Sequence, residues 1–171
     1  MDVIERCLAG EEEAFEALYQ QYARLVYHTA YLMLDNPQDA DDVLQEVFIR
    51  VFRYLGSYDP AQGAFTTWLH RITVNVCLRH MDQSPASAIP LSDSIGRSTR
   101  ETVDARIDAR QRVQGMLGGL APAFRVVVVL RFYDALSYQE IAQVLDIPIG
   151  TVQSRLSRAL RQLRREEEVQ S

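Results

Sequence analysis

Apolar residues recur at helical spacing through the first half of the chain. Three stretches show this period, each long enough for an amphipathic helix: residues 11–34, the residues that follow Pro37, and residues 64–81. Asn36 and Pro37 separate the first two, because proline cannot donate the amide that a continuing helix needs. The inward positions are Phe15, Leu18, Tyr19, Tyr22, Leu25, Val26 and Met33, then Val43, Leu44, Val47, Phe48, Val51, Phe52 and Leu55, then Phe65, Trp68, Leu69, Ile72 and Val76.

The second half continues the helical pattern after a segment rich in serine and proline. Residues 84–104 have little apolar content and predict a flexible linker. Beyond it, one helix is predicted to end at Gly118 and Gly119, and Pro122 is well placed to begin another. The valines at 126–129 favour a strand by their β-branched shape, but no partner strand or hairpin turn is visible, so we predict a buried helix. The predicted fold class is all-α, with two helical domains joined by the linker.

The run from Leu136 to Arg165 predicts a helix-turn-helix. Ser137 followed by Glu140 fits a capping box, which starts a helix at Ser137, and residues 146–148 interrupt that helix. A second helix then begins near Ile149. Its apolar face holds Val152, Leu156, Leu160 and Leu163, and its opposite face holds Arg158, Arg161 and Arg165.

This arginine-bearing helix is the candidate for contact with duplex DNA. In helix-turn-helix proteins the first turns of the second helix enter the major groove, where Gln pairs with adenine and Arg with guanine. The alternative is an amphipathic surface helix whose arginines are only solvated. It is disfavoured because the capping box, the interruption and the arginine face coincide in order and spacing. The predicted contacts with the duplex are Thr151, Gln153, Ser154, Arg155, Arg158 and Arg161.

The net charge of −5 argues against nucleic-acid binding until its distribution is considered. Residues 1–48 hold eleven acidic residues and two arginines, whereas residues 111–165 hold eight arginines and three acidic residues. The local charges are therefore −9 and +5. An acidic end suits a basic protein surface, and a basic end suits a phosphate backbone.

Several classes of function lack the residues that they require. No apolar run approaches the ~20 residues of a membrane span and no signal peptide is visible, so we expect a cytoplasmic protein without membrane insertion. No glycine-rich phosphate loop, nucleophile elbow or His-Glu-x-x-His motif occurs, and we predict no enzymatic activity and no cofactor. Cys7 and Cys77 are too few for a disulfide framework, and His70, Cys77 and His80 are only neighbours along one helix, so no metal site is predicted.

The helix-turn-helix resembles region 4.2 of the extracytoplasmic-function (ECF) sigma factors of bacterial RNA polymerase, group 4 of the sigma-70 family. The family pattern Leu-Ser-Tyr-x-Glu-Ile-Ala stands here at residues 136–142, and Ile-Pro-x-Gly-Thr-Val-x-Ser-Arg-Leu-x-Arg-Ala at residues 147–159. This resemblance implies sigma region 2 at residues 8–83 and sigma region 4 at residues 105–165. The acidic residues 166–168 predict a tail, residues 166–171, that ends the basic helix. The resemblance also implies binding to core RNA polymerase, through the β′ clamp and the β flap, and to promoter DNA in duplex and single-stranded form.

An acidic segment begins the second predicted helix. From charge alone, its carboxylates are a solvated face that favours the positive end of the helix macrodipole. Residues 39–48 also resemble region 2.2 of the ECF family, with the pattern Asp-Ala-x-Asp-x-x-Gln-Glu-x-Phe, whose polar side docks on the coiled coil of the β′ clamp. The resemblance implies polymerase contacts at Asp39, Asp41, Asp42, Gln45 and Glu46.

The third predicted helix combines aromatic residues with a polar stripe. Aromatic rings stack on bases and arginines neutralise phosphates, which suits single-stranded DNA, whereas a purely structural role for the aromatic residues leaves the polar stripe unexplained. The helix resembles family regions 2.3 and 2.4, Phe-x-x-Trp-Leu-x-Arg-Ile-x-x-Asn, which melt and recognise the minus-10 element, and the loop before it resembles the one that holds a flipped base. The implied minus-10 contacts are Ser57, Tyr58, Asp59, Trp68, Arg71, Asn75 and Arg79.

The function implied by the resemblance is that of an ECF sigma factor that directs core polymerase to promoters and is controlled by an anti-sigma factor. Basic residues frequent in the family are absent at three places near the end of the third helix, and Gln153 replaces a frequent lysine. We therefore expect unusual or weak promoter melting, because each missing phosphate contact lowers affinity. The alternative is a free-standing helix-turn-helix regulator that needs no core polymerase. The acidic segment distinguishes the two, because a repressor has no use for a clamp-docking surface.

Overall fold

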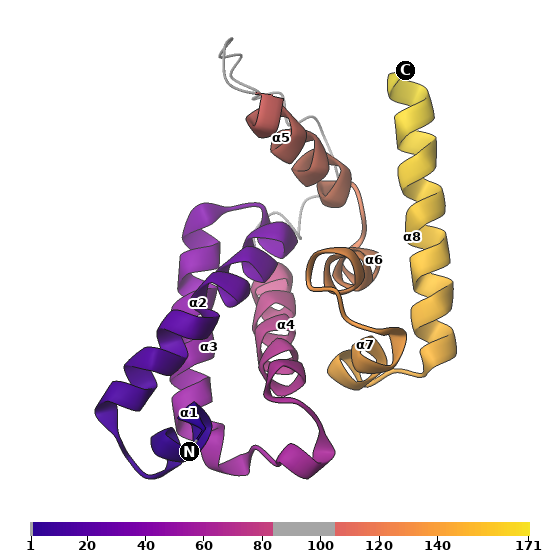
Figure 1. Ribbon diagram of the computed structural model, residues 1–171. Coiled ribbons are helices and arrows are strands. Elements are labelled where there is room, and N and C mark those ends of the chain that lie inside the picture. The colour runs from indigo at the N-terminus through magenta and orange to yellow at the C-terminus, as the bar shows by residue number, and fades with distance from the viewer. Residues whose placement is uncertain (1, 84–104) are drawn as a thin grey trace.

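The computed structural model describes residues 2–83 and 105–171, and within these residues every regular element is a helix (Figure 1). The all-α fold class predicted from the sequence is therefore confirmed. The predicted linker at residues 84–104 lies outside the described residues.

Helices α1 to α4 form the first domain. The short α1 (Val3–Leu8) packs on α2 (Glu12–Leu34), and α3 (Pro37–Tyr54) and α4 (Phe65–Gln83) complete the bundle. Two 3-10 turns, η1 (Leu55–Ser57) and η2 (Pro60–Gln62), connect α3 to α4. α1 begins before residue 8, where the sequence pattern starts the domain, and its Ile4 and Cys7 are buried in the core. The three long helices predicted for this half are all present.

Local chemistry explains why α2 and α3 are separate helices. Asp35 ends α2 in the left-handed conformation, with φ 53°, and its amide donates to the Tyr31 carbonyl at 2.9 Å. The Asn36 side-chain oxygen then accepts hydrogen bonds from the amides of Gln38 and Asp39, at 2.9 and 3.1 Å. Pro37 occupies the first turn, where a missing amide proton does no harm.

The second domain contains α5 (Ala105–Gly118), α6 (Pro122–Val128), the π-helical turn η4 (Val129–Tyr133), α7 (Tyr138–Leu145) and α8 (Ile149–Gln170). Residues 126–130 are helical and all five are buried, as predicted. Their β-branched preference is outweighed because α6 packs against α8 on one side and the first domain on the other. The acidic residues 166–168, which the sequence analysis placed in a tail, continue α8 without a break.

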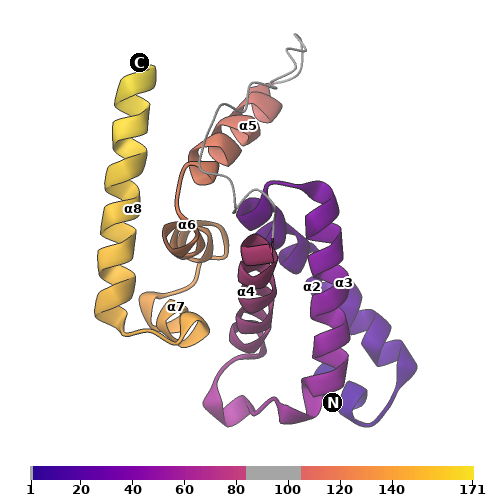
Figure 2. The same ribbon diagram turned by 180° about the vertical axis from the view of Figure 1, so that it is seen from behind.

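The two domains pack against each other. In both views α6 and α7 lie between α4 and α8, which places α8 on the outer side of the molecule (Figures 1 and 2). Gln114 donates to the Tyr31 carbonyl at 2.9 Å and to the Asp35 carboxylate at 3.0 Å, and Arg125 donates to the Met33 carbonyl at 2.5 Å. These second-domain donors satisfy acceptors at the C-terminal end of α2, where a helix leaves unpaired carbonyls and partial negative charge.

A buried polar cluster of Thr29, His70 and Asp134 lies in the same seam. The Thr29 hydroxyl donates to the Asp134 carboxylate at 3.0 Å, and His70 Nδ1 lies 3.8 Å from Asp134 Oδ2. Burial raises the pKa of Asp134 to about 7, although the Thr29 hydrogen bond opposes this shift. Burial also lowers the pKa of His70 to about 4, an effect that the nearby Glu140 partly offsets. Both shifts favour the neutral forms of these side chains.

Candidate nucleic-acid interface

Helices α7 and α8 form the predicted helix-turn-helix. The Ser137 hydroxyl oxygen accepts from the Glu140 amide at 3.1 Å, and the Glu140 carboxylate accepts from the Ser137 amide at 2.7 Å, so the predicted capping box is confirmed. Asp146 ends α7 in the left-handed conformation, with φ 53°, and Pro148 directly precedes α8. These signals end α7 and separate it from α8.

α8 buries one face and exposes the other. Val152, Leu156 and Ala159 are buried, and α8 packs against α6 and α7. Among the predicted DNA contacts, Thr151 and Arg155 are half-buried. The remaining predicted contacts on this helix are exposed: Gln153, Ser154, Arg158 and Arg161.

The arginines of α8 keep their charge available to an outside partner. Within the described residues none of them forms an ion pair with a carboxylate. Arg161 reaches the Ser157 hydroxyl at 3.5 Å, and the Ser154 hydroxyl donates to the Thr151 carbonyl at 3.1 Å. α8 lies on the outer side of the molecule (Figures 1 and 2), and Arg158, Arg161 and Arg165 are exposed, so a phosphate backbone can reach this basic face.

The loop between α3 and α4 is held by its own side chains. The Ser57 hydroxyl donates to the Tyr54 carbonyl at 2.7 Å, and the Asp59 carboxylate accepts from the Ala61 amide at 2.9 Å. The Tyr58 hydroxyl donates to the Gly63 carbonyl at 3.1 Å, and the Tyr58 ring lies 5.8 Å from the Trp68 ring. Four predicted minus-10 contacts, Ser57, Tyr58, Asp59 and Trp68, therefore lie together at one end of the first domain.

The other predicted minus-10 contacts follow α4. Arg71 and Asn75 are exposed and Arg79 is half-buried, whereas Phe65 is buried and belongs to the core. Arg71 donates to the Gln143 carbonyl of α7 at 2.5 Å, which places its guanidinium at the seam between the domains. The sequence pattern did not predict the α7 partner of Arg71.

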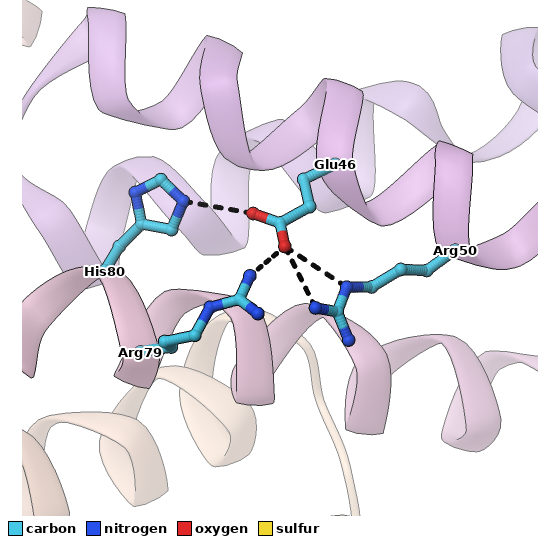
Figure 3. Close-up of polar contacts among 4 residues, drawn as sticks. All are labelled: Glu46, Arg50, Arg79 and His80. Carbon is cyan, nitrogen blue, oxygen red and sulfur yellow. Dashed lines mark hydrogen bonds and ion pairs between the residues drawn. The ribbon is translucent and has the colours of Figure 1, made fainter.

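The predicted polymerase contacts occupy the outer face of α3. Asp41, Asp42 and Gln45 are exposed and Asp39 is half-buried. Glu46 differs, because its half-buried carboxylate is bound from two helices (Figure 3).

Three cationic or polar side chains converge on Glu46. Arg50 donates to its Oε1 at 3.2 and 3.1 Å, Arg79 donates to the same oxygen, and His80 Nε2 lies 3.3 Å from Oε2. Glu46, a predicted polymerase contact, is thus hydrogen-bonded to Arg79, a predicted minus-10 contact. The Arg50 partner follows a sequence signal, since residues four apart meet on a helix, but the α4 partners have no such signal.

The described residues contain no group of three or more side chains arranged to hold a metal ion. Both cysteines are buried, and burial raises the pKa of the Cys77 thiol to about 12 and also raises the pKa of Cys7. The reactive thiolate is therefore disfavoured at both positions. None of the described helices combines the length and apolar character that crossing a membrane requires.

The chain is similar to known proteins over both domains. Residues 18–84 match the family model for Sigma-70 region 2, and residues 110–163 match the model for Sigma-70, region 4. The chain is 34% identical over 170 residues to the ECF RNA polymerase sigma-E factor of Escherichia coli K12, covering 92% of this chain and 88% of the relative. It is 39% identical over 161 residues to the ECF RNA polymerase sigma factor SigE of Mycolicibacterium smegmatis, covering 88% of this chain but only 60% of that longer relative.

A solved structure is similar to this chain over both domains. The structure of CnrH in complex with the cytosolic domain of CnrY has a TM-score of 0.76 to this chain at 25% identity, and the match covers 99% of this chain and 97% of that chain. The match therefore includes residues of both domains.

Proposed function

Since the chain belongs to the ECF RNA polymerase sigma factors, we propose that it binds core RNA polymerase and directs promoter recognition, DNA melting and transcription initiation. One observation carries the proposal: a single chain combines an acidic, exposed α3 face with a helix-turn-helix whose arginines face outward. The first suits a protein partner and the second suits DNA. A sigma factor is an initiation factor and not an enzyme.

Each surface has its own share of this task. The acidic face of α3, with half-buried Asp39 and exposed Asp41, Asp42 and Gln45, docks on the β′ clamp, and the second domain binds the β flap. α8 contacts the minus-35 duplex, with its first turns in the major groove and its later arginines on phosphates. These events take place in the cytoplasm, where the polymerase acts.

The loop and α4 hold the melted minus-10 strand. Extruding a base from the stack costs a few kcal/mol, and stacking on an aromatic ring returns about 1–3 kcal/mol per base. Tyr58 and Trp68 supply rings beside the loop, and the α4 polar stripe of Arg71, Asn75 and Arg79 supplies contacts to backbone and bases. The protein therefore stabilises an opened duplex without chemistry of its own.

An anti-sigma factor is the proposed regulator. CnrH, whose solved structure matches this chain over both domains, was solved with the cytosolic domain of a second protein, CnrY. A partner that binds both domains at once would hold them in the packed arrangement seen here and keep them from polymerase.

The experiment that tests the function is run-off transcription from a promoter library, with purified core polymerase and with or without this protein. We expect specific start sites that depend on both components, and the selected promoters should reveal both promoter elements. Binding to duplex DNA without core-dependent transcripts would instead support a free-standing regulator and refute the polymerase contacts.

The polymerase surface on α3 can be tested separately. Asp41→Arg combined with Asp42→Arg reverses the charge at two exposed positions, so we expect loss of co-purification with core polymerase while the thermal unfolding curve is retained. The matched control is Glu12→Arg combined with Glu13→Arg, which makes the same change of charge at the exposed start of α2. If both variants retain core polymerase equally, the α3 surface is not the polymerase-binding surface.

A further inference from the structure

Glu46 is the point at which the predicted polymerase surface and the predicted minus-10 surface meet. It lies on α3, one turn after Asp42 and next to Gln45, both exposed. Its carboxylate accepts hydrogen bonds from Arg79 on α4 and from Arg50 on its own helix (Figure 3). The residue that completes the docking face is therefore also the residue that holds an arginine of the DNA-binding helix.

Arg79 is not free to bind a phosphate in this arrangement. α4 carries two arginines between Phe65 and Gln83, and in the structure both have protein acceptors: Arg71 donates to the Gln143 carbonyl and Arg79 donates to Glu46. Basic residues are already scarce on α4, so the pairing of Arg79 removes a large part of the charge that would attract a single strand.

The Glu46–Arg79 pair is placed where a partner can exchange it. The side chains of Glu46 and Arg79 are 30% and 41% exposed, so water and other charged groups reach them. Ion pairs with this exposure are weak, because solvent screens them and each ion keeps much of its hydration. Two guanidinium groups, from Arg50 and Arg79, already compete for the same carboxylate oxygen. A further cation arriving at this face would add repulsion on Arg79 and a new partner for Glu46.

We propose that Glu46 is a positioning residue that keeps Arg79 from DNA in the free protein, and that docking of a basic polymerase surface on α3 takes over the Glu46 carboxylate and releases Arg79 to a backbone phosphate of the melted strand. The proposal rests on the function proposed above. Polymerase docking and single-strand binding are then coupled, and the coupling is reciprocal by thermodynamic linkage. The free protein avoids single strands elsewhere in the cell, and the holoenzyme gains the contact where it is needed.

Single-strand affinity of the free protein tests this exchange. The probe is a fluorescein-labelled dT12 strand, used in anisotropy titrations at several salt concentrations, since a phosphate contact does not depend on base sequence. Glu46→Gln keeps the shape of the side chain and removes its charge, so we expect several-fold tighter binding of dT12. The dependence of log affinity on log salt should steepen by about 0.7, the value for one additional phosphate contact on a single strand.

Asp42→Asn is the matched control. This variant removes one negative charge from the same helix. The hydrogen bond of Arg79 goes to Glu46 and not to Asp42, so the variant leaves the pairing of Arg79 in place. It should change dT12 affinity less than Glu46→Gln and leave the salt dependence unchanged. Adding Arg79→Gln to Glu46→Gln should abolish the gain. Equal effects of Glu46→Gln and Asp42→Asn, or a gain that persists without Arg79, would overturn the proposal.

The holoenzyme supplies a second measurement. The ratio of dT12 affinity with core polymerase to that without it should be smaller for Glu46→Gln than for the original chain, because Arg79 is already released. An unchanged ratio would contradict the exchange. If Glu46→Gln unfolds, Arg79→Gln in the otherwise original chain replaces it. The free protein should then bind dT12 as the original chain does, because Arg79 is already paired there, and the gain on adding core should be smaller. A loss of dT12 affinity in the free protein would contradict the exchange.

These results separate the inference from the proposed function. If the original chain supports core-dependent transcription but Glu46→Gln shows no selective gain, only the Glu46–Arg79 exchange is wrong. If no core-dependent transcripts form at all, the function itself is wrong, whatever the strand binding of the variants.

Discussion

Arg155 is the residue whose substitution best tests sequence recognition by α8. It lies in the second turn of the helix and is half-buried, so its guanidinium is more restrained than that of the exposed arginines beyond it. An arginine that contacts a base edge contributes both affinity and preference, whereas an arginine on a phosphate contributes affinity alone.

We expect Arg155→Ala to weaken binding to the minus-35 duplex by about 1–3 kcal/mol and to relax the preference at one base pair. Arg161→Ala, at an exposed position six residues later, should instead weaken binding to all sequences alike and lower the salt dependence by about one contact. Competition binding against a set of single-base variants measures both effects. An unchanged preference profile for Arg155→Ala would exclude contact with a base edge.

At this scale the sequence is informative where partners are close along the chain. Asp146 adopts the left-handed conformation, which aspartate tolerates better than most residues. The Ser137 and Glu140 contacts follow from a spacing of three. The Glu46–Arg79 bond joins residues 33 positions apart, and the Thr29–Asp134 bond joins residues 105 apart. No local pattern contains such pairs, because they depend on how the helices pack.

Among the elements, α7 is the one that depends most on its cap. It spans only Tyr138–Leu145, too short to be stable on its own, and the capping box satisfies amides at its start. α7 also contacts α4, so its position links the helix-turn-helix to the first domain.

Ser137→Ala removes the hydroxyl of that cap, and we expect the free energy of unfolding to fall by about 1 kcal/mol. Ser157→Ala is the matched control, because Ser157 is exposed within α8, where alanine is the better helix former. Urea denaturation followed by circular dichroism measures both variants. A loss of stability in Ser157→Ala as large as that in Ser137→Ala would show that the cap has no special weight.

Helices were predictable where the apolar periodicity and the helix-ending residues agree. They were less predictable where only one of these signals is present. The valines at 126–129 score as strand by shape, and only the lack of a partner strand favoured a helix, which packing then stabilises. At the end of α8 the charge pattern alone was misleading. Three successive glutamates predict a tail by their charge, but glutamate is a good helix former, and the helix continues through them to Gln170.

For the whole molecule, the packing of the two domains was beyond the sequence pattern. In the seam, Gln114, Arg125 and Asp134 of the second domain contact the end and face of α2, and Arg71 of α4 contacts α7. Each helix period predicts that a face is buried but not which other helix buries it. The linker composition of residues 84–104 therefore predicted that the chain divides into two domains, but it did not predict how the two domains contact each other.

The Thr29, His70 and Asp134 cluster makes the stability of this packed arrangement depend on pH. Burial raises the pKa of Asp134 from 3.8 to about 7, so the packed state favours the protonated carboxyl. The contribution of the protonated Asp134 carboxyl to the stability of the packed state is complete below pH 4 and is lost progressively as pH rises to about 7. The pKa of His70 shifts the opposite way, from 6.5 to about 4, so its burial opposes stability as pH falls through that window. The two side chains thus act in the same window, between about pH 4 and pH 7, and their effects on stability have opposite signs.

Asp134→Asn isolates the carboxylate, because an amide keeps the shape and can accept the Thr29 hydrogen bond but cannot ionise. We expect the variant to melt several degrees above the original chain at pH 8. The difference in melting temperature should be smaller at pH 5, because Asp134 of the folded original chain is still protonated there. Asp41→Asn, at an exposed carboxylate of α3, controls for the change in net charge. Thermal unfolding by circular dichroism at both pH values gives the two differences. Equal differences at pH 5 and pH 8 would mean that the carboxylate is ionised and paired in the seam, and a variant less stable at pH 8 would mean that its charge stabilises the contact between the domains.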